Sequence, residues 1–378
     1  MLTNIKIKSL FGLYDYELKF HDSISFVTGP NGFGKTTILK LIEALYSCDL
    51  QYLSGIIFDQ FDTTLCDCDK ITLISIKQER EYSDIEDESD ERSIPKVKLV
   101  INLTQDNNSL AAFTYNANTA DDTASSSDTM QLYMNTLSLT AIKDDRCIYL
   151  QSKDTQNSNV VKDINKQILS CKEVIAKELS EILTPDNDNI ISEEDYNREY
   201  NSIYPELQKL AKYGFIKDIK LPYIASNAGF LSTYIRVLKN IVNASSKIIN
   251  KLNALQKIVE KCEFANKNIF INADSGIRFI AQNETKSILY FEQLSSGERQ
   301  IVLLFYELLF KSSINSLVLI DEPELSLHIA WQYLFTENIQ SIIMANPQQQ
   351  YIIFTHSPSI INNRFDCAND LFDIHSNR

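Results

Sequence analysis

The sequence predicts an α/β fold that a helical region interrupts, and three observations support this prediction. An apolar strand pattern at 24–28 leads into a glycine-rich turn and then into a helical pattern at 35–47. Residues 160–266 place apolar side chains at helical spacing with charged side chains between them. Continuous apolar runs at 316–320 and 351–354 are typical of strands that are buried in a parallel sheet.

The first part of the chain is predicted to be rich in β-structure. Strands are expected at 4–8, 16–20, 24–28, 71–77, 96–103, 110–116 and 147–150. Two polar segments, 79–92 and 116–130, have the composition of mobile surface loops. We interpret the acidic first loop as a solvated surface segment. The alternative is a charge patch that repels nucleic acid or orients a partner.

The middle of the chain is predicted to be an all-helical insertion. Helices are expected at 160–183, 192–213 and 230–264, and the longest, of about 35 residues, would extend only ~50 Å. That length is too short for the arm of a long coiled-coil machine. Further along, we expect strands within 269–290, a helix at 296–311, a strand at 316–320, a helix from about 328 and a strand at 351–354.

Composition and charge argue against several classes of protein. The chain has 378 residues, and 36 basic against 50 acidic side chains give a net charge of −14. Such a balance argues against a protein that coats nucleic acid non-specifically, although a local basic face remains open. No apolar run approaches the length of a membrane span, and no signal peptide is visible, so a cytoplasmic protein without a membrane partner is expected. The seven cysteines are scattered and are expected to be reduced thiols.

The glycine-rich turn has the pattern G-x-x-x-x-G-K-[ST], placed between a predicted strand and a predicted helix. Its residues are Gly29, Pro30, Asn31, Gly32, Phe33, Gly34, Lys35 and Thr36, followed by Thr37. In this pattern backbone N–H groups surround a phosphate, Lys35 reaches the β- and γ-phosphates, and the Thr36 hydroxyl binds Mg²⁺. The segment therefore predicts ATP binding. The alternative is a glycine turn that only leads into a helix.

The apolar run at 316–322 ends in two carboxylates, Asp321 and Glu322. Ligands of parallel sheets bind beyond the carboxyl ends of the strands. Asp321 is therefore expected to bind Mg²⁺, directly or through water, and Glu322 to polarise an attacking water. Taken alone, two acidic residues after a strand also fit a simple polar end to that strand.

A third motif, Leu-Ser-Ser-Gly-Glu-Arg-Gln at 294–300, opens the helix that precedes this strand. Taken alone, it is a helix start, because Ser295 or Ser296 can cap the first turn. Glu298, three residues after Ser295, has the spacing of a capping box.

Together these motifs resemble those of ABC-type ATPases. Leu-Ser-Ser-Gly-Glu is similar to their signature motif, in the form found in the SMC, RecF and OLD branch. The stretch from Asp321 to His328, Asp-Glu-Pro-Glu-Leu-Ser-Leu-His, resembles the join between Walker B and the D-loop. Thr355-His356-Ser357-Pro358 resembles the switch histidine motif of the AAA_15, AAA_21 and OLD-like families. The resemblance covers roughly 1–50 and 285–375.

The resemblance implies an ABC-type P-loop ATPase head, a mixed sheet with an antiparallel β subdomain, carrying the all-helical insertion. It places the N-terminal part of the head at 1–155, the insertion at 156–267 and the C-terminal part at 268–378. It also implies ATP hydrolysis with Mg²⁺, with His356 contacting the γ-phosphate and orienting water. A lone histidine after a strand is otherwise a core or surface residue. Gln151 is the candidate for the glutamine that senses Mg²⁺, although the surrounding segment departs from the family pattern and a surface loop residue is the alternative.

The resemblance also implies dimerisation. In ABC heads the signature of one copy closes the site of another, so Ser295, Ser296, Gly297 and Glu298 would face the γ-phosphate bound by a second copy. Because the chain has one phosphate loop and one signature, two copies must pair head-to-tail, as a homodimer or a higher even oligomer, or a related subunit must take the place of the second copy.

Two functions remain open at this point. The first, which the resemblance to the AAA_15, AAA_21 and OLD-like families implies, is an ATP-dependent switch or sensor that controls a separate effector, such as a nuclease or toxin, in bacterial anti-phage defence. No nuclease constellation follows the ATPase motifs, so the effector is expected to be another chain. The alternative is a RecF- or SMC-like DNA-repair ATPase that clamps duplex DNA, which the lysines between 239 and 267 favour and the net charge of −14 disfavours. A membrane transporter's ATPase subunit is disfavoured by the insertion.

Overall fold

The computed structural model divides the chain into two compact units. The structure describes residues 1–67, 70–81, 95–117, 124–142, 157–183, 190–217, 220–282, 286–313, 315–345 and 348–376. The first unit consists of Met1–Arg146, Ser312–Thr336 and Pro347–Arg378, and the second of Cys147–Lys311 and Glu337–Asn346. Helix α9 (Ile329–Ala345) begins in the first unit and ends in the second.

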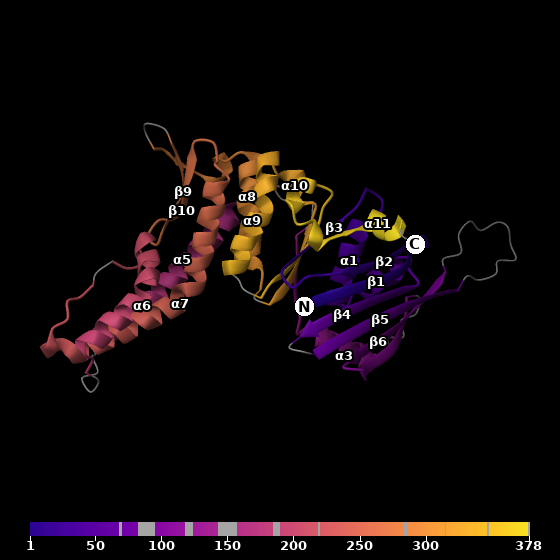
Figure 1. The fold of residues 1–378 in the computed structure, drawn as a ribbon, viewed down its shortest axis with the longest axis horizontal. Helices are drawn as coiled ribbons and strands as arrows, with labels where there is room; N and C mark the ends of the chain where they lie inside the picture. Colours follow the sequence, from indigo (N-terminus) through magenta and orange to yellow (C-terminus); the bar gives the residue numbers. More distant parts are fainter. Residues whose placement is uncertain are drawn as a thin grey trace. The chain divides into compact units, whose positions relative to one another are not determined.

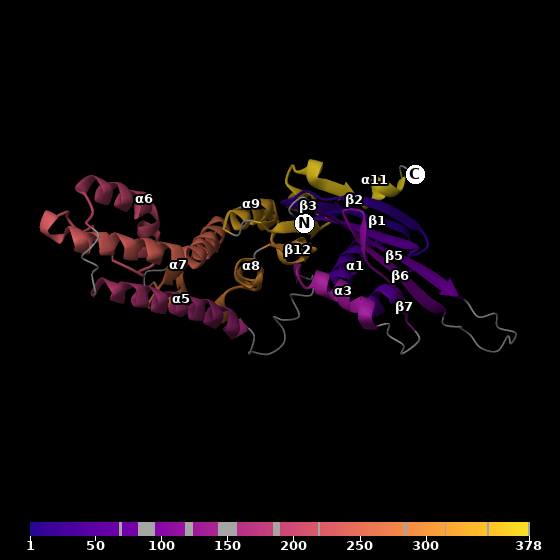
Figure 2. The ribbon, with the colours of Figure 1, turned by 90° about the horizontal axis from the view of Figure 1, so that it is seen from below.

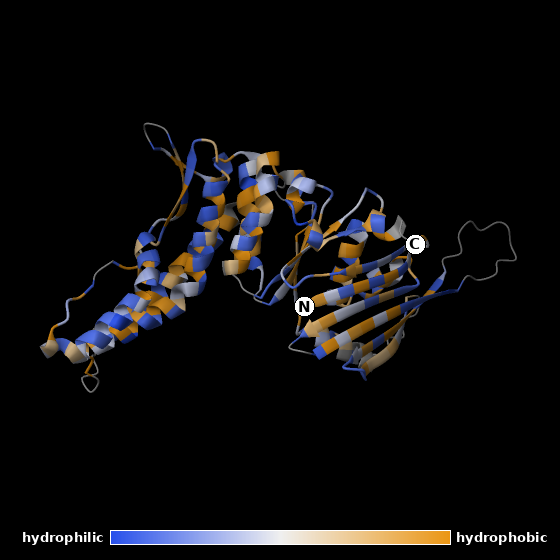
Figure 3. Ribbon diagram, viewed as in Figure 1, coloured by the Kyte–Doolittle hydropathy of each residue, from blue (hydrophilic) through white to orange (hydrophobic). Residues whose placement is uncertain are grey.

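The first unit contains an antiparallel sheet of six strands in the order β2-β1-β4-β5-β6-β7. The strands are β1 (Leu2–Leu10), β2 (Tyr14–Lys19), β4 (Gln60–Asp67), β5 (Lys70–Glu81), β6 (Lys96–Gln105) and β7 (Asn108–Asn116). Hydrophobic and hydrophilic residues alternate along these strands (Figure 3). One face of the sheet is therefore apolar and packs on the core, as an antiparallel sheet with one solvated face requires.

The second sheet of this unit is parallel, with the order β14-β3-β13-β12-β8. Its strands are β3 (Ile24–Thr28), which is labelled in Figure 1, β8 (Ser138–Ile142), β12 (Ser316–Asp321), β13 (Gln350–Phe354) and β14 (Ala368–Asp370). Every residue of β3, β12 and β13 is buried, which explains their continuous apolar pattern. The carboxyl ends of these three strands lie at one edge, because Val27 pairs with Phe354 and Phe354 with Asp321.

Helix α1 (Lys35–Ser47) packs in a core to which both sheets of the unit contribute. Its apolar side chains, such as Ile38 and Leu41, share one hydrophobic core with Phe61 of the antiparallel sheet and Leu319 of the parallel sheet. The short helices of the unit are α2 (Leu50–Gly55), α3 (Ala124–Met134), α10 (Pro358–Ile361) and α11 (Leu371–Ser376).

The predicted loop at 116–130 is wrong in part, because helix α3 occupies its last residues. Met130 and Met134, four residues apart and therefore on one helix face, are both buried in the core. Burial of this pair stabilises a helix whose serine-rich first half does not favour one. The loop predicted at 79–92 is also shorter, since β5 continues to Glu81, and residues 82–92 lie outside the described chain.

Three long helices dominate the second unit: α5 (Asn157–Ser180), α6 (Glu193–Lys212) and α7 (Ala228–Lys261). They lie alongside one another (Figure 2), and ion pairs join Arg236 to Glu181 and Lys239 to Glu199. A sheet of β9 (Lys267–Asn272), β10 (Gly276–Ala281) and β11 (Ile288–Leu289) packs against α5 and α7. Helix α8 (Ser296–Tyr306) continues into a π-helical turn (Glu307–Lys311). Among the described residues, no helix has the length and apolarity needed to cross a membrane.

The predicted mixed α/β fold with a helical region is confirmed. Strands β1 to β3, β5 to β7, β12 and β13 lie where the sequence predicts them, and so do α1, α5, α6 and α7. The strand predicted at 147–150 lies outside the described residues. The second unit includes more of the chain than the predicted insertion at 156–267, because β9 to β11 and α8 pack with its helices.

Gln350 at the start of β13 joins the two sheets of the first unit. Its buried side chain accepts a hydrogen bond from the Leu2 N–H at 2.8 Å and donates to the carbonyl oxygens of Leu2 at 2.7 Å and His21 at 3.0 Å. The backbone of β1 is thereby bonded to the parallel sheet.

We expect Gln350→Leu to lower the free energy of unfolding by about 2–4 kcal/mol, because each buried backbone group left without a partner costs about 1–3 kcal/mol. Urea denaturation measures this change. Gln131→Leu on the exposed side of α3 is the control and is expected to change stability by less than about 0.5 kcal/mol. Equal effects of the two substitutions would contradict the role of Gln350.

Candidate functional site

The phosphate-loop motif lies between β3 and α1, as predicted. Gly32 and Gly34 have φ angles of +89° and +87°, a backbone conformation that L side chains rarely adopt. Gly34 is the N-cap residue of α1 and has no side chain to cap the helix, and the first turn contains no acidic residue. The helix start is therefore open to an anion from outside the chain.

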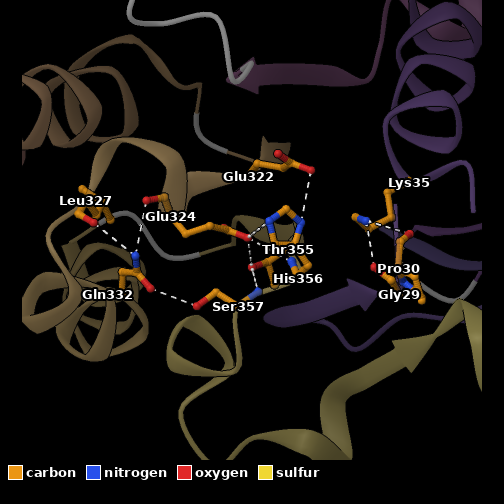
Figure 4. A network of polar contacts seen from close by, with 10 residues as sticks. All are labelled: Gly29, Pro30, Lys35, Glu322, Glu324, Leu327, Gln332, Thr355, His356 and Ser357. Atoms are coloured by element: carbon orange, nitrogen blue, oxygen red, sulfur yellow. Dashed lines mark hydrogen bonds and ion pairs between the residues drawn. The ribbon is translucent and has the colours of Figure 1, made fainter. Parts of the chain in front are cut away.

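Lys35 supplies a buried positive charge beside this loop. Its side chain donates hydrogen bonds to the carbonyl oxygens of Gly29 at 2.8 Å and Pro30 at 3.2 Å (Figure 4). The residue is only 5% exposed. Among the residues that the structure describes, no carboxylate forms an ion pair with it. Because a buried charge is costly without a counter-charge, this loop fits an anionic ligand.

Aromatic side chains hold the phosphate loop in place. The Tyr16 hydroxyl donates to the Phe33 carbonyl oxygen at 2.9 Å. The Phe33 ring lies 5.4 Å from that of Tyr14 and 5.8 Å from that of Phe372 in α11. Gly29 lies against α11 as well, because a Cβ atom at this position would come within 3.1 Å of Leu371. No sequence pattern indicated these contacts from α11.

Asp321 and Glu322 lie at the carboxyl end of β12, as predicted. Asp321 is the last strand residue and is 2% exposed. Glu322 has a left-handed backbone conformation, with φ 40° and ψ 59°, and its N–H donates to the Phe354 carbonyl oxygen at 2.8 Å. Such a conformation costs a non-glycine residue about 1–3 kcal/mol and is often found at functional sites. This turn directs the Glu322 side chain toward the loop that follows β13.

His356 in that loop lies between two carboxylates (Figure 4). Its Nδ1 atom is 3.4 Å from Glu322 Oε1, and its Nε2 atom is 3.8 Å from Glu324 Oε1. The structure thus brings together Glu322 and His356, two residues that the sequence predicts to act on ATP. The His356 side chain is 39% exposed, so it is accessible to a ligand.

Glu324 is part of this cluster, but the sequence motifs gave it no role. It is buried, and its Oε1 atom accepts hydrogen bonds from the Thr355 hydroxyl at 2.7 Å and from the His356 N–H at 2.9 Å. A signal was present in the sequence, because Pro323 separates two glutamates directly after a buried strand. Its partners lie 31 and 32 positions away, and local pattern alone does not identify such contacts.

The signature motif forms a helix start in the second unit. Ser295 is the N-cap of α8, the Glu298 N–H donates to its hydroxyl at 3.3 Å, and the Ser295 N–H donates to Glu298 Oε2 at 2.8 Å. The predicted capping box is therefore present. Ser296 is exposed and Gly297 is half-buried.

The Glu298 carboxylate is directed into the protein. Lys267 of β9 donates to both of its oxygens, at 2.9 and 3.1 Å, and the Glu298 side chain is 4% exposed. Burial acts to raise the pKa of Glu298. The hydrogen bonds from Lys267 and Ser295, with the charge of Lys267, outweigh burial and hold the pKa below its usual value. Glu298 is thus an ionised structural support of the signature turn.

The oxygen atoms near the phosphate loop fit Mg²⁺ chemistry. Among the described residues, no group of three or more His, Cys, Asp or Glu side chains is placed to bind a metal by itself. Mg²⁺ commonly takes one or two protein ligands and completes its shell with phosphate oxygens and water. The Thr36 hydroxyl and the buried Asp321 carboxylate have this chemistry. Gln151, the third predicted metal ligand, lies outside the described residues.

Comparisons with known proteins find one family and several solved structures to which the chain is similar. None of the curated proteins matches the chain. Among solved structures, the SMC head domain of Pyrococcus furiosus with an extended coiled coil, bound to the C-terminal domain of ScpA, is 13% identical, with a TM-score of 0.39, covering 96% of this chain and 91% of that one. The SMC head domain from Thermotoga maritima is 11% identical, with a TM-score of 0.39, covering 97% of this chain and 92% of that one. The profile of the family AAA_15, described as an AAA ATPase domain, matches residues 1–361. The chain therefore belongs to the AAA_15 family of AAA ATPase domains.

Proposed function

We propose that this chain binds and hydrolyses ATP, that two copies close head-to-tail around the nucleotide, and that the cycle switches a separate effector in bacterial anti-phage defence. The observation that carries the ATPase proposal is Lys35, a buried cation whose hydrogen-bond partners among the described residues are two neutral carbonyls of a glycine-rich loop. Its loop follows β3, one strand away from β13 and two from the β12 carboxylates at the same sheet edge.

Different residues of the first unit have different roles in the proposed hydrolysis. The N–H groups at the start of α1 and the Lys35 ammonium bind the β- and γ-phosphates. Thr36 and Asp321 would hold Mg²⁺, which when bound supplies charge neutralisation on the phosphate oxygens. Glu322 orients the attacking water and accepts its proton, and His356 contacts the γ-phosphate and fixes the position of that water.

The second copy completes the site. In the proposed dimer the Ser295 and Ser296 hydroxyls and the Gly297 N–H, at the start of α8, face the γ-phosphate of the partner's ATP. Glu298 contributes indirectly, because its carboxylate holds the turn through Ser295 and Lys267. Dimerisation is thus part of the chemistry.

The lysines of α7 and the segment after it favour a protein partner over duplex DNA. Lys239, Lys261 and Lys267 form ion pairs with Glu199, Glu337 and Glu298. Lys251 is buried, with its ammonium 5.6 Å from the centre of the Phe310 ring, and burial lowers its pKa to about 8. Only Lys247 and Lys257 of this run remain as exposed side chains without a carboxylate partner among the described residues. A DNA-binding face needs clustered, available cations, and this run does not provide them.

The first test is Glu322→Gln. We expect ATP hydrolysis to fall by about 100-fold or more, because the substituted amide cannot accept the proton of water. ATP-bound dimer should accumulate, measured by size-exclusion chromatography with light scattering. Glu79→Gln on the exposed face of β5 is the control and should leave turnover unchanged. Full turnover by the Glu322 variant would contradict the role of Glu322 as the group that accepts the proton of water.

The second test mixes two inactive variants, Lys35→Ala and Ser296→Arg. The exposed Ser296 is chosen because its replacement leaves the Ser295–Glu298 cap in place. A mixed dimer has one site with an intact phosphate loop and an intact signature, so an equal mixture should regain about one quarter of the wild-type sites. Phosphate release measures the gain. No recovery over either variant alone would contradict composite sites.

The third test separates the switch from a DNA clamp. With a non-hydrolysable ATP analogue, duplex DNA binding should be weak at about 0.15 M salt. Fluorescence anisotropy across a salt series measures it, with Lys35→Ala as the nucleotide-free control. Tight, ATP-dependent binding with a logarithmic salt slope steeper than about −3 would favour the clamp and contradict the protein-partnered switch.

A further inference from the structure

Glu324 is a buried carboxylate that the proposed mechanism does not use. The residue is 8% exposed, and its Oε2 atom is buried without a hydrogen-bond partner among the described residues. All of the hydrogen bonds recorded for the carboxylate therefore end on Oε1. Burying a carboxylate is costly, so these bonds must give the site something that an apolar residue does not.

The two donors to Oε1 are consecutive residues of the loop after β13. The Thr355 hydroxyl and the His356 N–H fix both the rotation of Thr355 and the path of the backbone at His356. Because the Thr355 hydroxyl donates its proton to Glu324, its oxygen accepts from the Ser357 N–H, at 3.0 Å. One carboxylate oxygen thus orders three successive residues.

Gln332 on α9 joins the same two segments a second time. Its amide nitrogen donates to the carbonyl oxygens of Glu324 at 3.3 Å and Leu327 at 3.1 Å. Its Oε1 accepts from the Ser357 hydroxyl at 2.9 Å. The loop that carries His356 is therefore hydrogen-bonded to the segment after Glu322 at both of its ends (Figure 4). Thr355 bonds Glu324 directly, and Ser357 is joined to it through Gln332.

We propose that Glu324 is a positioning residue that holds the 355–357 loop against the turn of Glu322, so that the His356 imidazole stays beside the Glu322 carboxylate. This inference rests on the proposed ATP hydrolysis and deepens it. Glu324 acts through its oxygen as a hydrogen-bond acceptor and does not contact substrate. A shift of the turn at 322–324 consequently carries His356 with it.

The test compares Glu324→Ala with Glu324→Gln. Alanine removes the acceptor, and misplacement of His356 is expected to lower kcat by about 10- to 100-fold. Glutamine keeps an acceptor oxygen and should retain kcat within about threefold of wild type. Binding of a fluorescent ATP analogue should stay within about twofold in both variants, because the phosphate loop is unchanged. Glu79→Ala, on an exposed strand, is the matched control and should change neither value.

A second measurement reports on the loop without turnover. The chain has four histidines, so a spectrum of protein labelled with ¹⁵N-histidine contains few amide signals. The His356 signal, identified by its loss in His356→Gln, should move in Glu324→Ala and stay close to its wild-type position in Glu324→Gln. Thermal melting of each variant checks that it is folded under the conditions in which its spectrum and its kcat are measured.

Three results would overturn the inference: wild-type kcat in Glu324→Ala, an unmoved His356 signal in that variant, or a Glu324→Gln variant as slow as Glu324→Ala with its signal in place. The last result would mean that the charge acts in the chemistry. Failure of the proposed function looks different, because wild-type protein would then release no phosphate at all.

Discussion

The parallel register of β3, β13 and β12 is the constraint on which the site depends. Pairing of Val27 with Phe354, and of Phe354 with Asp321, brings the ends of three strands to one sheet edge. Each strand ends at or directly before candidate functional residues, so their positions follow from backbone hydrogen bonds. The side chains then need only short turns to meet. Apolar burial on both faces holds the three strands in this register.

Two local distortions convert this edge into a site. The phosphate loop has glycines at positive φ, and the buried Lys35 beside them fits an anionic ligand. Glu322 also has a positive φ, although it is not a glycine, and this conformation costs free energy. The hydrogen bond from its N–H to the Phe354 carbonyl oxygen compensates part of that cost. Strain at Glu322 and hydrogen bonding at Glu324 therefore act on the same three residues, 322–324.

The sequence identified the features that depend on nearby residues. The phosphate loop, the carboxylates after β12 and the capping box at Ser295 each have a local pattern with a local cause. The role of Glu324 was missed because its partners come from the loop after β13, 31 and 32 positions away. Strand β4 was missed because the polar Thr63 lies between Phe61 and Leu65 on its buried face. Helix α3 depends on core burial and not on propensity, so composition misidentified it.

The bond from Gln350 to Leu2 spans 348 positions, and it has a consequence for the order of assembly. Strands β12, β13 and β14 all follow residue 315, so the parallel sheet that carries the phosphate loop lacks three of its five members until late in synthesis. The helices α5 to α7 have their contacts with one another much earlier. Domains tend to fold as units during synthesis. The first unit, which carries the phosphate loop, can therefore be completed only after the helices α5 to α7 of the second unit have been made.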